Sequence, residues 1–518
     1  MELFVMLIWL LLVCIIVFAV RSAFRLEHPQ ARGSDVWFHL HASEGIRKNS
    51  HKMPEALDGF VIKTPFDYPP LVHYLLSFIS RKNRERLEPF FGSGVDIVQA
   101  IALFLFTFSL TSNYQAAFLS GILFAFFPML VKADARVFFL SPRPFGELFA
   151  SLGIILTLFF VWFGDIPSLA LSMFCLSFVF LSSKFGTQAI VFLYIALTFF
   201  LLNGYIILIL LGGLLLAILI SKGHYVKVLK GHIRHSAFYR RAIVHKHSWT
   251  KQISGAGEGK TSGERLLITA LKNPIFYAIA YSPLLVLLLL FLVFKLDVFV
   301  NNNILLALLA WSGTSLLLVV VISTPELRYL GEAERYMEYS SIPLCAVISI
   351  AAFLVDSSYT WILLGFLLLY SMILIYFSHQ QAVTEFVKRP PSQTDTEELF
   401  AHLSQIPGSA VLCVPITTSF EVSYKSHHWT VFWGGNVPEP PFSRDDFDFI
   451  FEHEFPFPSD DLDPLIRKYR ADHLLVWKGS LDRAPRGYYR DLTRFPLVFE
   501  NSSYALYSTG TAQVTNQT

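Results

Sequence analysis

Residues 33–75 read GSDVWFHLHASEGIRKNSHKMPEALDGFVIKTPFDYPPLVHYL. This polar stretch follows a first apolar run, residues 3–20, that is long enough to cross the hydrocarbon core of a bilayer. Its first acidic residue, Asp35, stands about fifteen residues beyond that run, and so short a tether holds the carboxylate near the membrane surface. The stretch therefore predicts a polar layer directly beside a membrane domain.

A helix is expected at the start of this stretch. Ser34 and Asp35 are favourable N-cap residues before VWFHLHASEGIRKN, and a period of 3.6 places Asp35, Phe38 and His39 on one face. Two interpretations of Asp35 remain open on these residues alone. The carboxylate caps an interfacial helix, or it is a general base placed where a lipid-borne substrate would lie.

The composition is that of a polytopic membrane protein. Of the 518 residues, 54% are hydrophobic and only 15% are charged, against roughly 25% charged in an average soluble domain. Apolar runs of bilayer length recur up to about Phe377, so one membrane domain and one C-terminal soluble domain are expected. The formal net charge of +2 provides no global field for nucleic acid, and the lipid bilayer is the expected partner.

Hydropathy predicts about eleven membrane spans. The first lacks a basic leader and a small-residue cleavage site, so we interpret it as an uncleaved helix and not as a signal peptide. The other spans are expected at about 95–112, 116–131, 145–163, 166–181, 188–202, 204–220, 276–294, 304–322, 341–355 and 361–377. These spans predict a membrane domain over residues 1–381, whose first outer loop covers residues 21–94.

An odd number of spans places three polar elements on the face of the Asp35 loop: residues 132–144, residues 323–339 and the C-terminal domain. Parity also places the basic loop 222–273 there, against the usual bias of Lys and Arg toward the cytoplasm. Three explanations stay open. Long loops translocate regardless of charge, the region 184–221 crosses once and not twice, or the loop forms a basic amphipathic helix on the membrane surface.

Charged side chains gather where spans meet the membrane boundary. Lys132, Asp134 and Arg136 follow the third span, and Lys184 stands between two apolar runs. A charge at the bilayer centre costs about 2.5 to 3.5 kcal/mol on insertion scales, so ionisable groups close to hydrocarbon are usually functional. The alternatives are snorkelling side chains that face the head groups and, for Lys184, a short outer turn.

Arg335 is the last basic residue before a late apolar span, in the sequence STPELRYLGEAERYMEYSSIPL. A guanidinium at the mouth of a helix bundle suits a phosphate, because its rigid fork of donors stays charged at any working pH. The alternative is an ion pair with Glu334 or Glu338 on a surface turn, since such exposed pairs are common and weak.

The chain becomes charged and contains more proline from about residue 382. Helices are expected in TDTEELFAHLSQI and SDDLDPLIRKYRA, strands in GSAVLCVP, HHWTVFWGG and DHLLVWKG, and a final hairpin that turns at residues 500–502. This alternation predicts a small extracytoplasmic α/β domain over residues 382–518. The domain sequence contains no phosphate loop, no GxGxxG and no metal-ligand spacing such as HExxH.

Four short motifs carry a resemblance to a known family. They are SDVWFH in the first outer loop, DYPPL before an amphipathic segment, KADAR after the third span and ERY at the entrance of a late span. In this layout residues 1–377 resemble the GT-C glycosyltransferases of membranes, with distant similarity to oligosaccharyltransferase catalytic subunits and protein mannosyltransferases. The WWDYG sequon-reading motif of the oligosaccharyltransferases is absent, which argues against protein N-glycosylation.

The resemblance implies transfer of a sugar from a polyprenyl-phosphate donor to an acceptor hydroxyl or amide on the extracytoplasmic or lumenal face. Asp35 matches the first-loop catalytic carboxylate of that family, Asp134 its second acidic motif, and Arg335 the basic residue that holds the donor phosphate. Arg136 or Lys184 is expected to complete the phosphate clamp. The residues expected to line the substrate cleft are His39, Tyr68, Glu334 and Tyr336.

A divalent metal ion between Asp35 and Asp134 is compatible with these residue types, which do not fix its identity. A transporter or flippase of a lipid-linked saccharide and a polysaccharide polymerase are the alternative functions. A transporter would carry ionisable groups at mid-membrane and internal repeats with broken helices. No such repeat is seen in this sequence and its charges cluster at one face, so an enzyme is favoured.

Overall fold

The computed structural model describes residues 2–132, 140–243, 273–324, 326–388, 390–434, 443–452, 455–481, 484 and 492–510. The chain divides into two compact units. Unit 1 comprises Met1–Pro29, Arg86–Val226 and Gly259–Val383, and unit 2 comprises Gln30–Glu85, Lys227–Glu258 and Thr384–Thr518.

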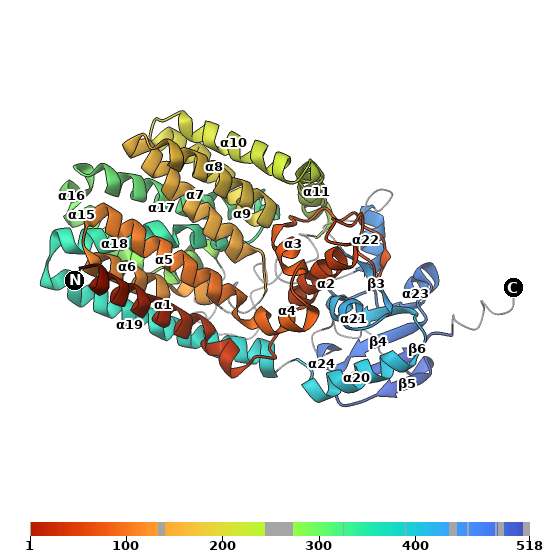
Figure 1. Cartoon of the computed structure of the whole chain (residues 1–518). Coiled ribbons are helices and arrows are strands. Elements are labelled where there is room, and N and C mark those ends of the chain that lie inside the picture. Colours follow the sequence, from red (N-terminus) through yellow and green to blue (C-terminus); the bar gives the residue numbers. More distant parts are fainter. Residues whose placement is uncertain are drawn as a thin grey trace. The chain divides into compact units, whose positions relative to one another are not determined.

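The described elements of unit 1 are helices (Figure 1). Its long helices are apolar along most of their length. Its first elements are α1 Glu2–Glu27, η1 Glu88–Phe90, α5 Phe91–Thr111, α6 Tyr114–Ala125, η2 Pro128–Val131, α7 Arg143–Phe163, α8 Ile166–Ser182, α9 Lys184–Phe200 and α10 Tyr205–Ile220. The later elements are α14 Pro274–Ala280, α15 Leu284–Phe294, α16 Leu296–Val300, α17 Asn303–Ile322, η5 Arg328–Leu330, η6 Ala333–Ser340, α18 Ser341–Val355 and α19 Ser358–Val383. The side chains of Asn113, Asp165 and Asn302 accept hydrogen bonds from backbone N–H groups and so cap α6, α8 and α17.

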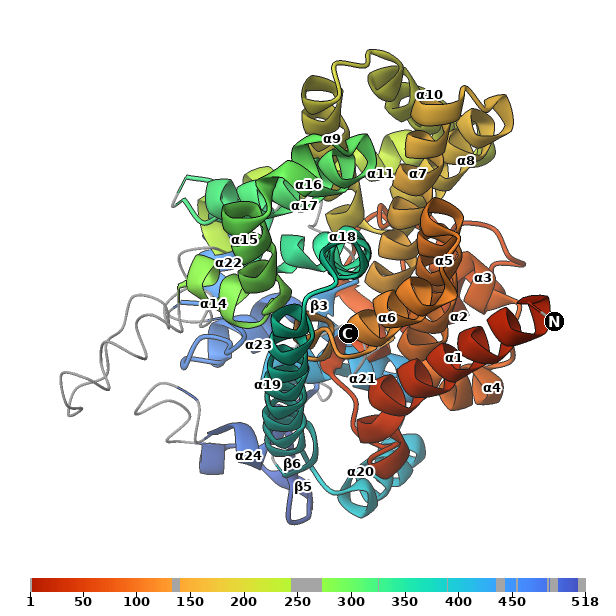
Figure 2. The same ribbon diagram turned by 90° about the vertical axis from the view of Figure 1, so that its left-hand side faces the viewer.

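Helix α18 lies in the middle of unit 1, and Figure 2 shows it among the surrounding helices. It contacts α5, α6, α15 and α17, and every residue from Ser341 to Ala352 is buried. A helix that is apolar on all sides is stable in this position because other helices cover it. Helix α19, in contrast, exposes large apolar side chains such as Ile362 and Phe366, which suits contact with lipid.

Six helices of the described residues are long and apolar enough to cross a membrane, or up to eight if each of two bent pairs is one span. The bent pairs are Tyr205–Ile220 with His224–Ala242, at 115°, and Pro274–Ala280 with Leu284–Phe294, at 82°. Three further apolar helices are shorter, namely Tyr114–Ala125, Ile166–Ser182 and Lys184–Phe200. The apolar helices are those of a membrane protein, but the prediction of about eleven spans is not confirmed, because these three fall short of the usual spanning length.

A six-stranded sheet organises unit 2 (Figure 1). Its strands are β1 Phe60–Ile62, β2 Ala410–Val414, β3 Trp429–Trp433, β4 His473–Trp477, β5 Leu497–Glu500 and β6 Tyr504–Ser508, in the order β1-β3-β2-β4-β6-β5. The pairs among β1, β3, β2 and β4 are parallel, and β6 pairs antiparallel with both β4 and β5. Val411 to Val414 are all buried, as expected for a central strand that is covered on both faces.

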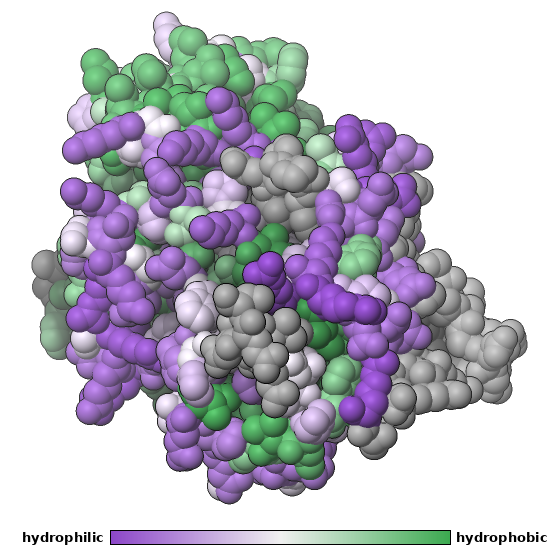
Figure 3. Space-filling view, turned by 90° about the vertical axis from the view of Figure 1, so that its right-hand side faces the viewer, coloured by the Kyte–Doolittle hydropathy of each residue, from purple (hydrophilic) through white to green (hydrophobic). Residues whose placement is uncertain are grey.

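The secondary structure predicted for the C-terminal part is confirmed. The predicted helices are α20 Gln393–Gln405 and α23 Asp463–Tyr469, and the predicted hairpin is formed by β5 and β6. The remaining helices of this unit are α2 Ser34–Lys48, α3 Leu71–Ser77, α4 Arg81–Leu87 (residues 81–85 in unit 2), α11 His224–Phe238 (from residue 227), η4 Tyr239–Ile243, η7 Thr384–Lys388, η8 Ile416–Thr418, α21 Ser419–Lys425, α22 Arg444–Ile450, α24 Lys478–Leu481 and η9 Leu492–Arg494. Hydrophilic side chains cover much of the face of the molecule seen in Figure 3.

Strand β1 comes from the first loop and not from the C-terminal part. It pairs with β3 in the register Phe60 with Thr430 and Ile62 with Trp433. A Cβ atom at Gly434 would lie 2.4 Å from the Phe60 ring, so only glycine permits this close approach. The first loop therefore completes one edge of the sheet, and the domain boundary expected between residues 381 and 382 stays a prediction.

Candidate functional site

Asp35 stands in the first turn of α2 and is exposed. The helix begins at Ser34 after an extended Gly33, so Gly33 is the N-cap and the predicted N-cap role of Ser34 and Asp35 is wrong. A carboxylate in the first turn still interacts favourably with the helix dipole. The next residues, from Val36 to Leu40, are buried. Packing of α2 thus holds the Asp35 carboxylate at the surface of unit 2.

His39 and Tyr68, two of the predicted cleft residues, lie side by side with ring centroids 5.8 Å apart. Both rings also contact His73, at 5.1 Å from His39 and 5.4 Å from Tyr68. The two imidazoles are buried and share a hydrogen bond of 2.9 Å between His39 Nδ1 and His73 Nε2. Sequence reasoning missed His73, because no local pattern relates two histidines that lie on different helices.

This chain of hydrogen bonds fixes the tautomer of both imidazoles. His73 Nδ1 lies 3.2 Å from the Pro69 carbonyl oxygen, which can only accept, so Nδ1 carries the proton. Burial lowers the pKa of His73 to about 4, so its Nε2 is unprotonated at neutral pH and accepts from His39 Nδ1–H. Burial, and then repulsion from His73, also lower the pKa of His39. His39 Nε2 therefore has a lone pair that can accept a hydrogen bond from a hydroxyl.

A second group of candidates gathers around η6 in unit 1. In a 3-10 helix residues three apart lie in one row, and one row of η6 holds Tyr336 and Tyr339. Their rings contact Phe185 at 4.4 and 6.3 Å, and Tyr336 Oη donates to Gln188 Oε1 at 3.4 Å. Because Lys184 precedes Phe185 at the start of α9, the structure brings Lys184 and Tyr336 onto neighbouring elements.

The carboxylates of this segment are engaged by different cations. The ion pairs are Glu332 with Arg335, Glu334 Oε1 with Lys132 Nζ at 3.1 Å, and Glu338 Oε2 with Arg143 Nε at 3.9 Å. Arg335 is thus paired within its own loop, as the alternative interpretation held, but with Glu332 and not with Glu334 or Glu338. Glu332 and Glu338 both stand three residues from Arg335, so spacing alone does not choose between them, and Glu338 is paired with Arg143.

Arg335 and Lys184 nevertheless keep features that suit an anion. The side chain of Arg335 is 26% exposed, and a partly exposed ion pair contributes little stability, so a phosphate can compete with Glu332 for the guanidinium. Lys184 is the first residue of α9, where Ser183 accepts from the backbone N–H of Gly186. Helix N-termini favour negative charge, so an anion bound there would meet both the lysine and the helix dipole.

Asp134 and Arg136, the other two charged candidates, lie outside the described residues. Within the described ranges, no three side chains of His, Cys, Asp or Glu come together as a metal site would require. The candidates that are described fall into the two groups above: Asp35, His39 and Tyr68 in unit 2, and Lys184, Glu334, Arg335 and Tyr336 in unit 1.

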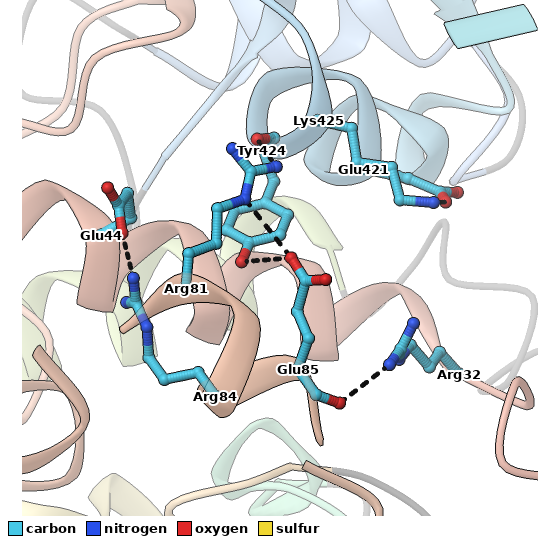
Figure 4. A network of polar contacts seen from close by, with 8 residues as sticks. All are labelled: Arg32, Glu44, Arg81, Arg84, Glu85, Glu421, Tyr424 and Lys425. Atoms are coloured by element: carbon cyan, nitrogen blue, oxygen red, sulfur yellow. Dashed lines mark hydrogen bonds and ion pairs between the residues drawn. The ribbon is translucent and has the colours of Figure 1, made fainter. Parts of the chain in front are cut away.

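A polar network binds the first loop to the C-terminal part of unit 2 (Figure 4). The guanidinium of Arg81 lies 4.3 Å from the Tyr424 ring centroid and donates to the Tyr424 carbonyl oxygen at 3.0 Å. Tyr424 Oη donates to Glu85 Oε1 at 2.9 Å, and buried Arg84 pairs with Glu44 of α2. These bonds join α4 to α21 and to the helix that carries Asp35, so the carboxylate rests on a rigid support.

No family model and no curated protein matches the chain. Solved structures do match it. A crystal structure of an Archaeoglobus fulgidus oligosaccharyltransferase, tethered through a disulfide bond to an acceptor peptide containing the NVT sequon, aligns with a TM-score of 0.57 at 13% identity, covering 90% of this chain and 69% of that one. The oligosaccharyltransferase AglB of the same organism, in complex with an inhibitory peptide and a dolichol-phosphate, aligns with a TM-score of 0.52 at 12% identity, covering 92% and 70%.

An apo crystal structure of the Archaeoglobus fulgidus enzyme gives a TM-score of 0.53 at 12% identity, covering 90% of this chain and 69% of that chain. At such identities the likeness is one of fold. The chain has a GT-C-like glycosyltransferase fold, and the resemblance predicted from its short motifs is confirmed at that level.

Proposed function

We propose that this chain is a membrane glycosyltransferase that transfers a sugar from a polyprenyl-phosphate-linked donor to an acceptor glycan, lipid or protein. The observation that carries the proposal is the exposed carboxylate of Asp35 on the first-loop helix, in a chain whose fold resembles an oligosaccharyltransferase solved with a dolichol-phosphate. The protein would be multi-pass, with its active site on the extracytoplasmic face of the cell membrane, or in the lumen of the endoplasmic reticulum in a eukaryote.

Asp35 is the general base of this reaction. Its carboxylate takes the proton of the acceptor hydroxyl or amide while the acceptor atom bonds to the anomeric carbon. The bond from that carbon to the donor phosphate breaks on the opposite side, so the configuration inverts. The electron pair leaves with the polyprenyl phosphate, which needs cations to hold its charge and no general acid.

Arg335, with Arg136 or Lys184, holds the leaving phosphate in this proposal. A guanidinium offers two parallel donors to phosphate oxygens, a geometry that an ammonium cannot reproduce. Binding the donor exchanges the carboxylate of Glu332 for a phosphate at Arg335. Asp134 is assigned as the second acidic residue of the reaction centre, and a divalent metal ion remains compatible with it, but no step depends on that ion.

The cleft residues have separate roles. His39 Nε2 accepts from a sugar or acceptor hydroxyl, because the hydrogen bond to His73 keeps that nitrogen unprotonated. Tyr68 shapes the cleft wall, and the proline that follows it favours an extended conformation at Tyr68 itself. Tyr336 and Glu334 line the donor side, where Glu334 already neutralises Lys132.

Consumption of a polyprenyl-phosphate sugar by the purified protein is the decisive experiment. An enzyme releases polyprenyl phosphate in detergent and yields a glycosylated acceptor, whereas a flippase moves the intact donor across proteoliposomes without consuming it. A polymerase would consume the donor and lengthen its product stepwise. Translocation without any release of polyprenyl phosphate, across a panel of donors, would overturn the proposed transfer reaction.

A further inference from the structure

Helix α11 and the turn η4 that follows it take no part in the proposed reaction. Residues 227–243 of this segment belong to unit 2, as does the first loop. The segment follows the apolar helix α10 after a turn of residues 221–223, with a bend of 115°. A turn of that length spans at most about 10 Å, so α11 begins close to the end of a helix whose exposed side chains are apolar.

The surface of α11 has three distinct sides. Val228, Gly231 and His232 are buried and form the inner side. Leu229 and Ile233 are one turn apart, and their side chains are 37% and 64% exposed. Lys230 is exposed beside this apolar stripe, and Lys227, which is also exposed, lies farther round the helix, near the side of Arg234. None of the described carboxylates makes an ion pair with either lysine.

An ion pair fixes which side of α11 faces outward. Arg234 Nη2 lies 2.7 Å from Asp67 Oδ2, and the Asp67 side chain is 3% exposed. The same carboxylate lies against Gly231, where a Cβ atom would come within 2.2 Å of Asp67 Oδ2. Only glycine allows so close a contact. The helix is therefore bound to the first loop in one rotation, with Leu229 and Ile233 directed away from Asp67.

We propose that the outward side of α11 binds the surface of a bilayer that contains anionic phospholipids. Leu229 and Ile233 enter the head-group layer, and Lys227 and Lys230 contact lipid phosphates. Exposed Arg240 and Arg241 of η4 extend the basic strip. Apolar burial and attraction to anionic lipid together hold such helices in the interface.

The contact with the first loop also bears on the sidedness of the basic residues in α11. The Arg234–Asp67 pair places α11 on the same side of the membrane as the first loop. The charge bias toward the cytoplasm does not decide the location of this segment, because its basic residues have head-group phosphates as partners.

Lipid-quenching measurements on the full-length protein in nanodiscs test the proposal independently of any transfer reaction. A fluorophore is attached at Ile233→Cys in a Cys14→Ser background, since the other native cysteines are buried. Spin-labelled phosphatidylcholine should quench it, and the same label on phosphatidylglycerol, at equal low mole fraction, should quench it more strongly. A fluorophore at Leu497→Cys, another exposed apolar site, on β5, should not be quenched.

The second part of the test measures how quenching by the anionic lipid depends on the charge of the helix. K227Q/K230Q should lower the preference for the anionic lipid by about fivefold or more while quenching by phosphatidylcholine persists. R467Q/K468Q, which removes two exposed charges from α23, should leave the preference unchanged. Absence of quenching at position 233 would mean that a protein or solvent covers this side, and an unchanged preference in K227Q/K230Q would remove the lysines from the site. Either result overturns the proposal.

Discussion

At the scale of single residues, Asp35 carries the greatest weight in the proposed reaction. Asp35→Asn keeps the size of the side chain but cannot accept a proton, so sugar transfer should fall by about 10²- to 10⁴-fold. Folding should change little, because a charge in the first helical turn contributes only about 0.3–1 kcal/mol. The initial rate of donor release by purified variants measures the effect.

Asp58→Asn is the matched control for this substitution, because Asp58 is another exposed carboxylate of the first loop. Its rate should stay near that of the unmodified protein. Transfer by Asp35→Asn at more than about a tenth of the normal rate would remove Asp35 from the role of base.

Substitutions of Arg335 and of its partner Glu332 should change donor affinity in opposite directions if Arg335 binds the donor phosphate. Arg335→Lys should weaken donor use about tenfold, because an ammonium cannot give the paired contacts to phosphate oxygens. Glu332→Gln should tighten donor binding, because it removes the carboxylate that competes with the phosphate for the guanidinium. Donor KM values of both variants test this pattern. A purely structural ion pair predicts the opposite for Glu332→Gln, namely lost stability and no gain in donor affinity.

The buried histidine pair should make unit 2 sensitive to acid. The pKa of His73 is about 4 in the folded protein, below the ordinary value near 6.5, and burial lowers the pKa of His39 in the same direction. The contribution of these uncharged histidines to the free energy of unfolding is therefore fully present above pH 6.5 and is lost as the pH falls through 4. His73 alone contributes about 3 kcal/mol. Thermal unfolding midpoints of the unmodified protein and of H39F/H73F, measured across this range, should converge at low pH. Parallel curves would contradict the assignment.

At the scale of elements, the ion pair between buried Arg84 of α4 and Glu44 holds α2 in place. Arg84→Ala leaves the Glu44 carboxylate, which is 18% exposed, without this cation, and should destabilise unit 2 by about 3 kcal/mol. Arg81→Ala breaks a more exposed ion pair with Glu85 and should cost less than about 1 kcal/mol from that pair. Unfolding midpoints followed by tryptophan fluorescence compare the two variants. A loss below about 1 kcal/mol for Arg84→Ala would mean that burial of this ion pair does not matter.

At the scale of the whole molecule, the proposal requires the first loop, α11 and the C-terminal strands to share one side of the membrane. Cysteines introduced at Ser50, Lys230 and Thr509 in a Cys14→Ser background should react with an impermeant thiol reagent from the same side. Gln115, exposed in the first turn of α6, should react only from the other side. Labelling of Ser50 and Gln115 from the same side would contradict this arrangement.

The sequence by itself determined the class of the protein and the place of its apolar helices. Within a bilayer a long apolar run has few solutions other than a helix, so the predicted spans fall on apolar helices, although the span at 276–294 is divided into α14 and α15, bent by 82°. Local alternation and turn residues likewise located the strands and the final hairpin of the C-terminal part. The short motifs were sufficient to identify the GT-C-like fold.

Only the tertiary structure decided which strands pair and which side chains contact one another. Pairing of β1 with β3, the contact of His39 with His73 and the bond between Arg234 and Asp67 join residues far apart in sequence, and no local periodicity specifies such contacts. Arg335 pairs with Glu332 while Glu338, equally spaced in the sequence, pairs with Arg143 of another helix, which a count of charges cannot reveal.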